Sequence, residues 1–181
     1  MKIVLVILSF FIFIKNINAM NLLEKKKNFE NFHKEWEFIS DQVMGGLSSG
    51  KIDLIEFEEA NFIRLSGIVS TENNGGFIQY TSDYKFEEKS FRGIRIKAKG
   101  IPSEYYIHIR TNFLFLPWQY YSGKFSVTEN WKYVEILFDD FSKSNFYQPS
   151  EFDSSQIKSI GFVAFGKDFD AQLDIIEAEL F

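Results

Sequence analysis

Apolar and polar residues alternate along most of the chain from about Trp36 to its end, which is the pattern of β-strands with one buried face. Turn-forming residues interrupt the alternation, among them NNGG at 73–76 and Gly100-Ile101-Pro102. Many short strands joined by turns predict an all-β fold, an antiparallel sandwich or barrel. The clearest alternating stretches are FRGIRIKAK (91–99), YYIHIRT (105–111), WKYVEILF (131–138), IKSIGFVAF (157–165) and QLDIIEAELF (172–181).

Residues 21–36, NLLEKKKNFENFHKEW, depart from this alternation. Phe29, Phe32 and Trp36 stand at positions i, i+3 and i+7, which would place them on one face of a short helix. We expect a helical or extended segment here that leads into the first strand and covers part of a sheet.

The N-terminus has the pattern of a secretory signal peptide. Lys2 precedes an apolar run at residues 3–14, and a polar stretch then ends in the small residue Ala19. The run is shorter than the ~20 residues of a spanning helix. We therefore expect export to the periplasm with cleavage after Ala19, and the alternative is an uncleaved membrane anchor. The domain organisation expected is a signal peptide at 1–19, a lead-in segment at 20–35 and a β-sandwich domain at 36–181.

Charge narrows the choice of partners. Loss of Lys2 and Lys15 with the signal peptide leaves 18 basic residues against 25 acidic ones, a net charge of −7. A domain this acidic repels phosphate backbones, which argues against nucleic acid as a partner. The chain has no cysteine and hence neither a disulfide nor a lipoprotein anchor. Once cleaved, it is not expected to insert stably into a membrane.

The stretch MGGLSSGKI at 44–52 has the spacing of a phosphate-binding loop, but two features contradict that interpretation. Ile52 stands where such a loop needs Ser or Thr, and strand-like alternation follows where a helix is needed. A β-hairpin that turns at residues 58–61 fits better.

Residues for catalysis or metal binding are scarce. Two histidines, His33 and His108, and no cysteine make a zinc site improbable, and G-x-S-x-G is absent. The acidic pairs at 139–140 and 168/170 could contribute to a calcium site, but solvated loops are the favoured interpretation. We expect no cofactor, no metal and no enzymatic activity.

An ordered set of motifs resembles the complex I intermediate-associated protein 30 family. The set runs from DQVMGGLS (41–48) through GGF (75–77), GIRIKAKG (93–100), YIHIRT (106–111) and PWQYY (117–121) to WKYV (131–134). The resemblance covers roughly residues 36–181. It implies a galactose-binding-like β-sandwich of jelly-roll type and an assembly-factor or chaperone-like role. The motif residues expected to be structural are Asp41, Met44, Gly45, Gly46, Gly75 and Gly76.

One group of side chains is a candidate binding surface. If Ile107 and Ile109 point into the core, their neighbours on the same strand point outward, and the next two strands would add to that face. The residues expected there are Tyr106, His108, Arg110, Trp118, Tyr120, Trp131, Tyr133 and Glu135.

Exposed aromatic and charged side chains suit two kinds of ligand. Trp, Tyr and Arg dominate contacts with protein partners, and aromatic rings flanked by polar groups also suit sugar rings. The first hypothesis is a non-enzymatic, assembly-factor-like module for a protein partner, and the alternative is a carbohydrate-binding module. A third interpretation is structural: residues 21–36 or 112–117 fold over the face and make it a second small core.

Overall fold

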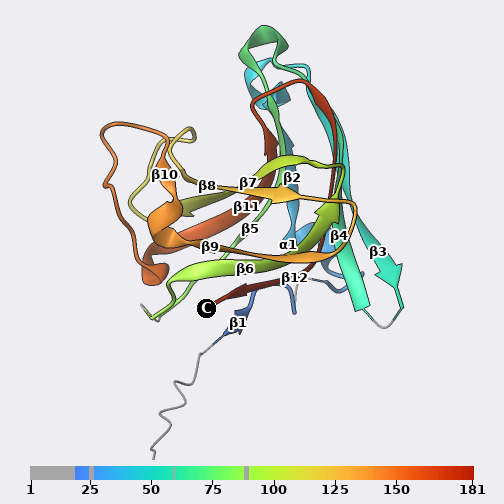
Figure 1. The fold of residues 1–181 in the computed structure, drawn as a ribbon. Coiled ribbons are helices and arrows are strands. Elements are labelled where there is room, and N and C mark those ends of the chain that lie inside the picture. The colour runs from blue at the N-terminus through green and yellow to red at the C-terminus, as the bar shows by residue number, and fades with distance from the viewer. Residues whose placement is uncertain (1–18, 25–26, 59, 88–89) are drawn as a thin grey trace, which may run out of the picture.

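The computed structural model describes residues 19–181 except 25–26, 59 and 88–89. The predicted signal peptide (residues 1–19) therefore lies outside the described residues except for Ala19. Two antiparallel sheets pack face to face, as Figure 1 shows, and the predicted all-β sandwich is confirmed. No helix in this part of the chain is long and apolar enough to cross a membrane.

The first sheet, sheet A, includes the long C-terminal strand near its centre. Its spatial order is β3 (Ser49–Phe57), β4 (Ala60–Val69), β12 (Phe169–Leu180), β6 (Gly93–Gly100) and β9 (Lys132–Leu137), with β1 (Met20–Asn21) paired to β12.

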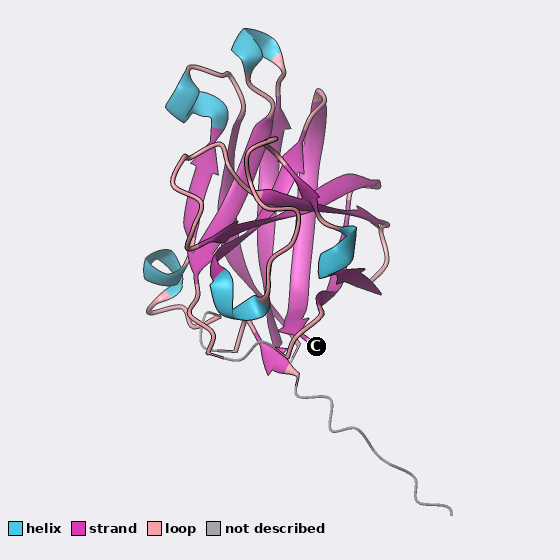
Figure 2. Ribbon diagram, turned by 90° about the vertical axis from the view of Figure 1, so that its left-hand side faces the viewer, coloured by secondary structure: helices cyan, strands magenta, loops and turns pink. Residues whose placement is uncertain are grey.

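The second sheet, sheet B, carries the candidate surface. Its spatial order is β10 (Ser142–Lys143), β8 (Tyr121–Val127), β7 (Ser103–Thr111), β11 (Ile157–Phe165), β5 (Phe77–Asp83) and β2 (Glu37–Ser40). Short helical turns occur in the connections at the periphery of the sandwich, as Figure 2 shows. They are α1 (Phe32–Glu35) and the 3-10 turns η1 (Asp41–Met44), η2 (Glu72–Asn74), η3 (Phe138–Asp140) and η4 (Ser154–Gln156).

Alternate residues of each strand fill the space between the sheets. Tyr105, Ile107 and Ile109 of β7 are fully buried there. On β11 the inward residues are Ile160 and Phe162. The period of two seen in the sequence thus fixes which side of β7 faces outward.

The lead-in segment enters this core instead of covering the outside. Phe32 and Trp36 are buried, and the Trp36 ring lies 5.1 Å from Tyr80 and 6.2 Å from Phe162. The predicted single helical face is wrong for Phe29, which is 53% exposed. The helix spans only four residues, and the backbone of Trp36 is already extended. Residues at i, i+3 and i+7 therefore do not lie on one helical face.

The hairpin predicted in place of a phosphate loop is confirmed. Strands β3 and β4 pair in register with Phe57 opposite Ala60, so the turn is shorter than predicted and Ala60 already belongs to β4. Gly50 and Lys51 lie within β3, and no helix follows them. The Lys51 side chain forms an ion pair with Asp53 on the same strand, 2.9 Å away.

Candidate functional site

The family motif forms a hydrogen-bonded clamp around Asp41. Its carboxylate has no exposed surface, and it accepts hydrogen bonds from the backbone N–H of Ser48 (2.9 Å), Gly76 (2.5 Å) and Phe77 (3.2 Å). The Ser48 hydroxyl donates a further bond. Burial by itself would raise the pKa of Asp41, but these hydrogen bonds outweigh it and lower the pKa. The clamp joins the loop before β3 to the loop before β5.

The glycines of the motif make room for that carboxylate. A Cβ on Gly46 would lie 2.3 Å from the Asp41 carboxyl carbon, and one on Gly75 would lie 2.4 Å from its Oδ2. Gly45 and Gly76 have φ angles of 90° and 129°, which favour glycine. All four glycines therefore serve the fold, whereas Met44 of the same motif is exposed.

The outer face of sheet B carries the first part of the candidate surface. Tyr106, His108 and Arg110 alternate with the buried residues of β7, as the sequence predicts. On the neighbouring strands, His108 stands opposite Ser122 and Gly161, and Tyr106 opposite Lys124 and Val163. Val163 is fully buried without belonging to the main core, so side chains on this face cover it.

Four rings on this face pack together, and we call them the aromatic cluster: Tyr106, His108, Tyr120 and Phe165. Tyr120 stacks on His108 with ring centroids 4.0 Å apart. Phe165 lies edge-on to both Tyr106 and His108, at 5.7 Å. These rings form a small second layer outside the main core.

Two polar atoms within this layer lack a hydrogen-bond partner. His108 Nε2 and Arg110 Nε are buried, and neither is paired with any described residue. Burial lowers the pKa of His108 to about 3, so the ring is neutral at physiological pH. Arg110 uses another nitrogen, Nη2, to donate to the carbonyl of Leu116 at 3.3 Å.

Neither segment proposed as a cover closes the face. The lead-in segment packs in the core, and the 112–117 loop reaches the face through the Leu116 carbonyl on Arg110. Trp118 is 57% exposed.

Five large apolar side chains on two neighbouring loops form a second feature, which we call the paired-loop surface. They are Phe115, Leu116, Trp118, Phe146 and Tyr147, with exposed fractions from 42% to 89%. Hydrogen bonds through Ser144 join the loops: its hydroxyl donates to the Trp118 carbonyl and accepts from the Tyr120 N–H. In Figure 1 the loops lie side by side beyond β8 and β10. In the sequence, the run FLFLPW at 113–118 is the signal that points to this surface.

The third predicted part of the candidate face lies elsewhere. Trp131 immediately precedes β9, and Tyr133 and Glu135 lie within it; β9 pairs with β6 in sheet A. The prediction that three successive strands display one surface is therefore wrong. The chain crosses between sheets after β8, and the alternation of Val134 and Ile136 is the same whichever sheet receives the strand.

Interactions within sheet A occupy these three side chains. Glu135 pairs with Arg95 at 2.7 Å, and the Tyr133 hydroxyl donates to Glu177 at 2.8 Å, which raises the pKa of Tyr133. The Lys99 ammonium lies 4.8 Å from the Trp131 ring centroid. This face satisfies its own polar groups and is a weaker candidate for ligand binding.

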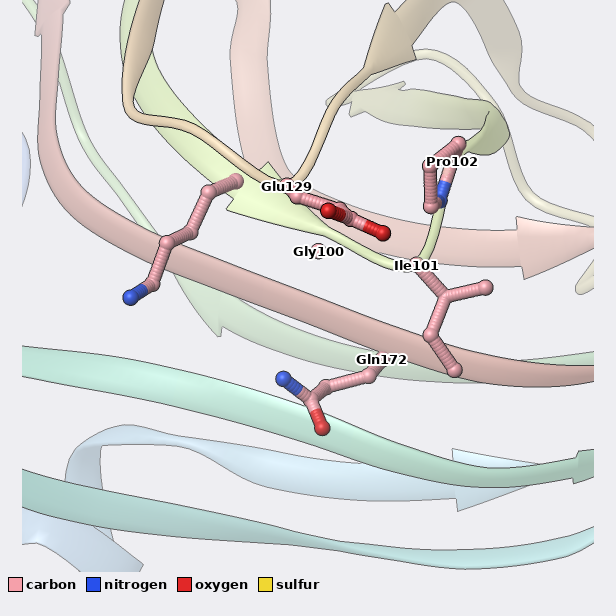
Figure 3. Close-up of a pocket in the computed structure, with 6 residues that line it drawn as sticks. Gly100, Ile101, Pro102, Glu129 and Gln172 are labelled. Atoms are coloured by element: carbon pink, nitrogen blue, oxygen red, sulfur yellow. The ribbon is translucent and has the colours of Figure 1, made fainter.

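A shallow pocket of about 310 Å³ opens at one end of sheet A (Figure 3). Its polar groups come from Lys99, Glu129 and Gln172, and Ile101 and Pro102 form its apolar side. These groups can hold a small polar molecule. Among the lining residues, no nucleophilic side chain stands beside a general base, the combination that nucleophilic catalysis needs.

The two acidic pairs considered as calcium ligands, 139–140 and 168/170, have different surroundings. Asp168 accepts hydrogen bonds from the N–H and hydroxyl of Thr71, at 2.6 and 2.8 Å, and these bonds lower its pKa. Asp139 and Asp140 are exposed on η3. Within the described ranges, no three His, Cys, Asp or Glu side chains are grouped to hold a metal ion.

The fold is that of a galactose-binding-like jelly-roll sandwich. The family 11 carbohydrate-binding module from Clostridium thermocellum in complex with a β-1,3-1,4-mixed-linked tetrasaccharide is similar, with a TM-score of 0.69 and 16% identity over 90% of this chain and 95% of the module. The same type of module from the cellulosomal cellulase Lic26A-Cel5E of that organism has a TM-score of 0.65 and 17% identity, over 81% and 87% of the two chains.

The sequence defines the family. Residues 24–175 match complex I intermediate-associated protein 30 (CIA30), and the chain belongs to that family, as the motifs indicated. No curated protein is significantly similar to this chain. The two similar structures are described as carbohydrate-binding modules.

Proposed function

We propose that this chain is a non-enzymatic binding module that holds an oligosaccharide on the outer face of sheet B. The observation that carries the proposal is the pair of unpartnered buried atoms, His108 Nε2 and Arg110 Nε, within the aromatic cluster. Buried polar atoms are nearly always hydrogen-bonded, so a missing partner on a surface layer points to a ligand or water.

A sugar hydroxyl matches these two atoms because it donates and accepts at once. It can accept from Arg110 Nε, and it can pair with His108 Nε2 in either tautomer of the neutral ring. The rings of Tyr106 and Tyr120 offer apolar faces to sugar C–H groups. Because Tyr120 stacks on His108, the Tyr120 side chain rotates away when the sugar hydroxyl reaches His108 Nε2. The tetrasaccharide complex of the similar family 11 module supports this choice of ligand.

Isothermal titration with a β-1,3-1,4-mixed-linked tetrasaccharide tests the proposal. His108→Phe keeps a ring against Tyr120 and removes Nε2, so we expect about tenfold weaker binding with an unchanged melting temperature. Tyr133→Ala on sheet A is the matched control and should bind normally. Absence of binding to this and other soluble glycans would refute the proposal.

A protein partner is the second candidate, with an assembly-factor-like role as the family description suggests. The observation in its favour is exposed Trp118 near Arg110, because Trp and Arg are enriched in the energetic centres of protein interfaces. Crosslinking in the exported fraction should then give a defined product that Trp118→Ala removes and the tetrasaccharide does not displace. Loss of the product on adding the tetrasaccharide would assign it to the sugar site.

An oligosaccharide ligand is compatible with a location outside the cytoplasm. We propose export with cleavage after Ala19, on the basis of Lys2 and the apolar run at 3–14. Mass spectrometry of the native protein should find Met20 at its N-terminus. An intact Met1 in the soluble cytosolic fraction would contradict export.

A further inference from the structure

The paired-loop surface is too large and too exposed to be ordinary surface. Phe115, Phe146 and Tyr147 are 86%, 83% and 89% exposed, and Trp118 and Leu116 adjoin them on the same loops. An aromatic side chain can bury about 150–250 Å². Summed over the two loops, these side chains expose an apolar area comparable to that of the largest apolar patch on a typical monomer, about 300–600 Å², which commonly marks a binding surface.

The loops present these side chains instead of folding them inward. Besides the bonds of Ser144, the Gln148 amide donates to the Tyr120 carbonyl at 2.9 Å. Lys143 Nζ donates to the carbonyls of Phe146 and Gln148, at 3.3 and 3.2 Å. The backbone polar groups nearest the tips are thus bonded within the loop pair, and the apolar side chains remain outside.

The arrangement of the rings does not suit a sugar. The rings of Phe146 and Tyr147 are inclined by 85° to each other, with centroids 5.5 Å apart. Two nearly perpendicular neighbours cannot lie flat against one glycan chain. They can both enter a soft apolar phase.

Charge distinguishes this surface from the rest of the chain. The whole chain has a net charge of −5, yet residues 105–128 and 141–150 contain no Asp or Glu. The same two stretches contain Arg110, Lys124 and Lys143. Lys124 is paired with Glu104 outside them, while Lys143 lies at the base of the loop that carries Phe146. Asp139, Asp140 and Glu151 lie just outside these stretches. Within them, an apolar tip with cationic and no anionic side chains complements an anionic lipid headgroup layer.

We propose that the paired-loop surface docks peripherally on a lipid bilayer that contains anionic headgroups. Phe115, Phe146 and Leu116 enter the boundary between headgroups and acyl chains, and Trp118 and Tyr147 lie at headgroup level, where amphipathic rings accumulate. Lys143, at the base of the loop that carries Phe146, faces the lipid phosphates. The outer face of sheet B stays accessible beside the bilayer, so the sugar site and the membrane contact are separate.

Sedimentation of the full chain with sucrose-loaded vesicles tests the proposal. We expect more binding to an equimolar mixture of phosphatidylcholine and phosphatidylglycerol than to phosphatidylcholine alone. Phe146→Ala with Tyr147→Ala should lower the partition coefficient about tenfold or more, because two exposed rings lose their burial. Phe29→Ala, which truncates an exposed ring outside the loops, should bind like the wild type. An equal loss in both variants would overturn the proposal.

A second measurement locates the contact and separates it from binding by the apolar N-terminal run. Brominated lipids should quench the fluorescence of Trp118, and Trp118→Phe should remove the quenched component while sedimentation persists. Sedimentation without that quenching would overturn the proposal. Failure to bind either vesicle would also overturn it, and a protein crosslink lost in Phe146→Ala would then assign the surface to a protein partner. His108→Phe should bind vesicles normally, so loss of the sugar site does not mimic loss of this one.

Discussion

Tyr120 lies nearly face to face on His108, with ring centroids 4.0 Å apart and planes inclined by 19°. The contact joins the segment before β8 to the middle of β7 and covers a ring nitrogen that has no partner. It makes His108 both part of the proposed sugar site and a titratable group whose protonation opposes folding.

The first prediction concerns acid stability. Burial lowers the pKa of His108 to about 3, whereas an unfolded histidine titrates near 6.5. The unfolded chain therefore binds a proton first, and the free energy of unfolding should fall as the pH drops from about 6.5 towards 3. Urea denaturation across this range should show a shallower dependence for His108→Phe. Parallel curves for the wild type and His108→Phe would contradict this account.

The second prediction concerns the carboxylate clamp. Asp41→Asn leaves one acceptor but turns an amide group towards donors such as the Gly76 N–H, so we expect a loss of about 2–3 kcal/mol in the free energy of unfolding at neutral pH. The hydrogen bonds lower the pKa of Asp41, so its contribution is present above the unfolded pKa of about 3.9 and is lost as the pH falls through the folded pKa. Exposed Asp168, changed to Asn, should cost less. A larger loss in Asp168→Asn would show that the clamp is not the stronger contact.

The third prediction uses two adjacent glycines as a matched pair. Gly45→Ala places its Cβ in open space but at a φ of 90°, which should cost about 1–2 kcal/mol. Gly46→Ala places its Cβ 2.3 Å from the Asp41 carboxyl carbon, which should cost about 3 kcal/mol or more because the clamp must open. Chemical denaturation of both variants measures the difference. Equal losses would show that the Asp41 side chain can move away from the new Cβ without a loss of stability.

The fourth prediction separates surface from core. Trp118→Ala should change the free energy of unfolding by no more than about 0.5 kcal/mol, because the side chain is more than half exposed. Ile109→Ala, nine residues earlier and fully buried, should cost about 2–5 kcal/mol. Parallel thermal melts compare them. A loss for Trp118→Ala as large as that for Ile109→Ala would make Trp118 part of a second core.

The sequence predicted the sandwich and the inward side of β7 because burial of one face imposes a period of two on any strand. It could not assign β9 to a sheet. Val134 and Ile136 alternate identically in either sheet, and only the crossing after β8 decides the partner. Phe29 was misplaced for a related reason: a helical period has meaning only where a helix forms, and α1 has four residues.

The positions of the candidate residues could be predicted only in part. Tyr106, His108 and Arg110 followed from strand parity alone, whereas the stacking of Tyr120 depends on a loop whose path is set by bonds to Ser144. The sequence could not show why Gly75 is needed, because the space it leaves for the Asp41 carboxylate exists only once two segments more than thirty residues apart meet in the fold.

The pairing of β1 with β12 places Met20 opposite Leu180, so residues 20 and 180 are strand neighbours (Figure 1). A few added residues could therefore join residue 181 to residue 20, and the chain could be reopened in the β3–β4 hairpin without cutting across either sheet. Such a circular permutant would preserve the outer face of sheet B and the paired loops, and it would offer a second attachment point for immobilisation at the far edge of sheet A.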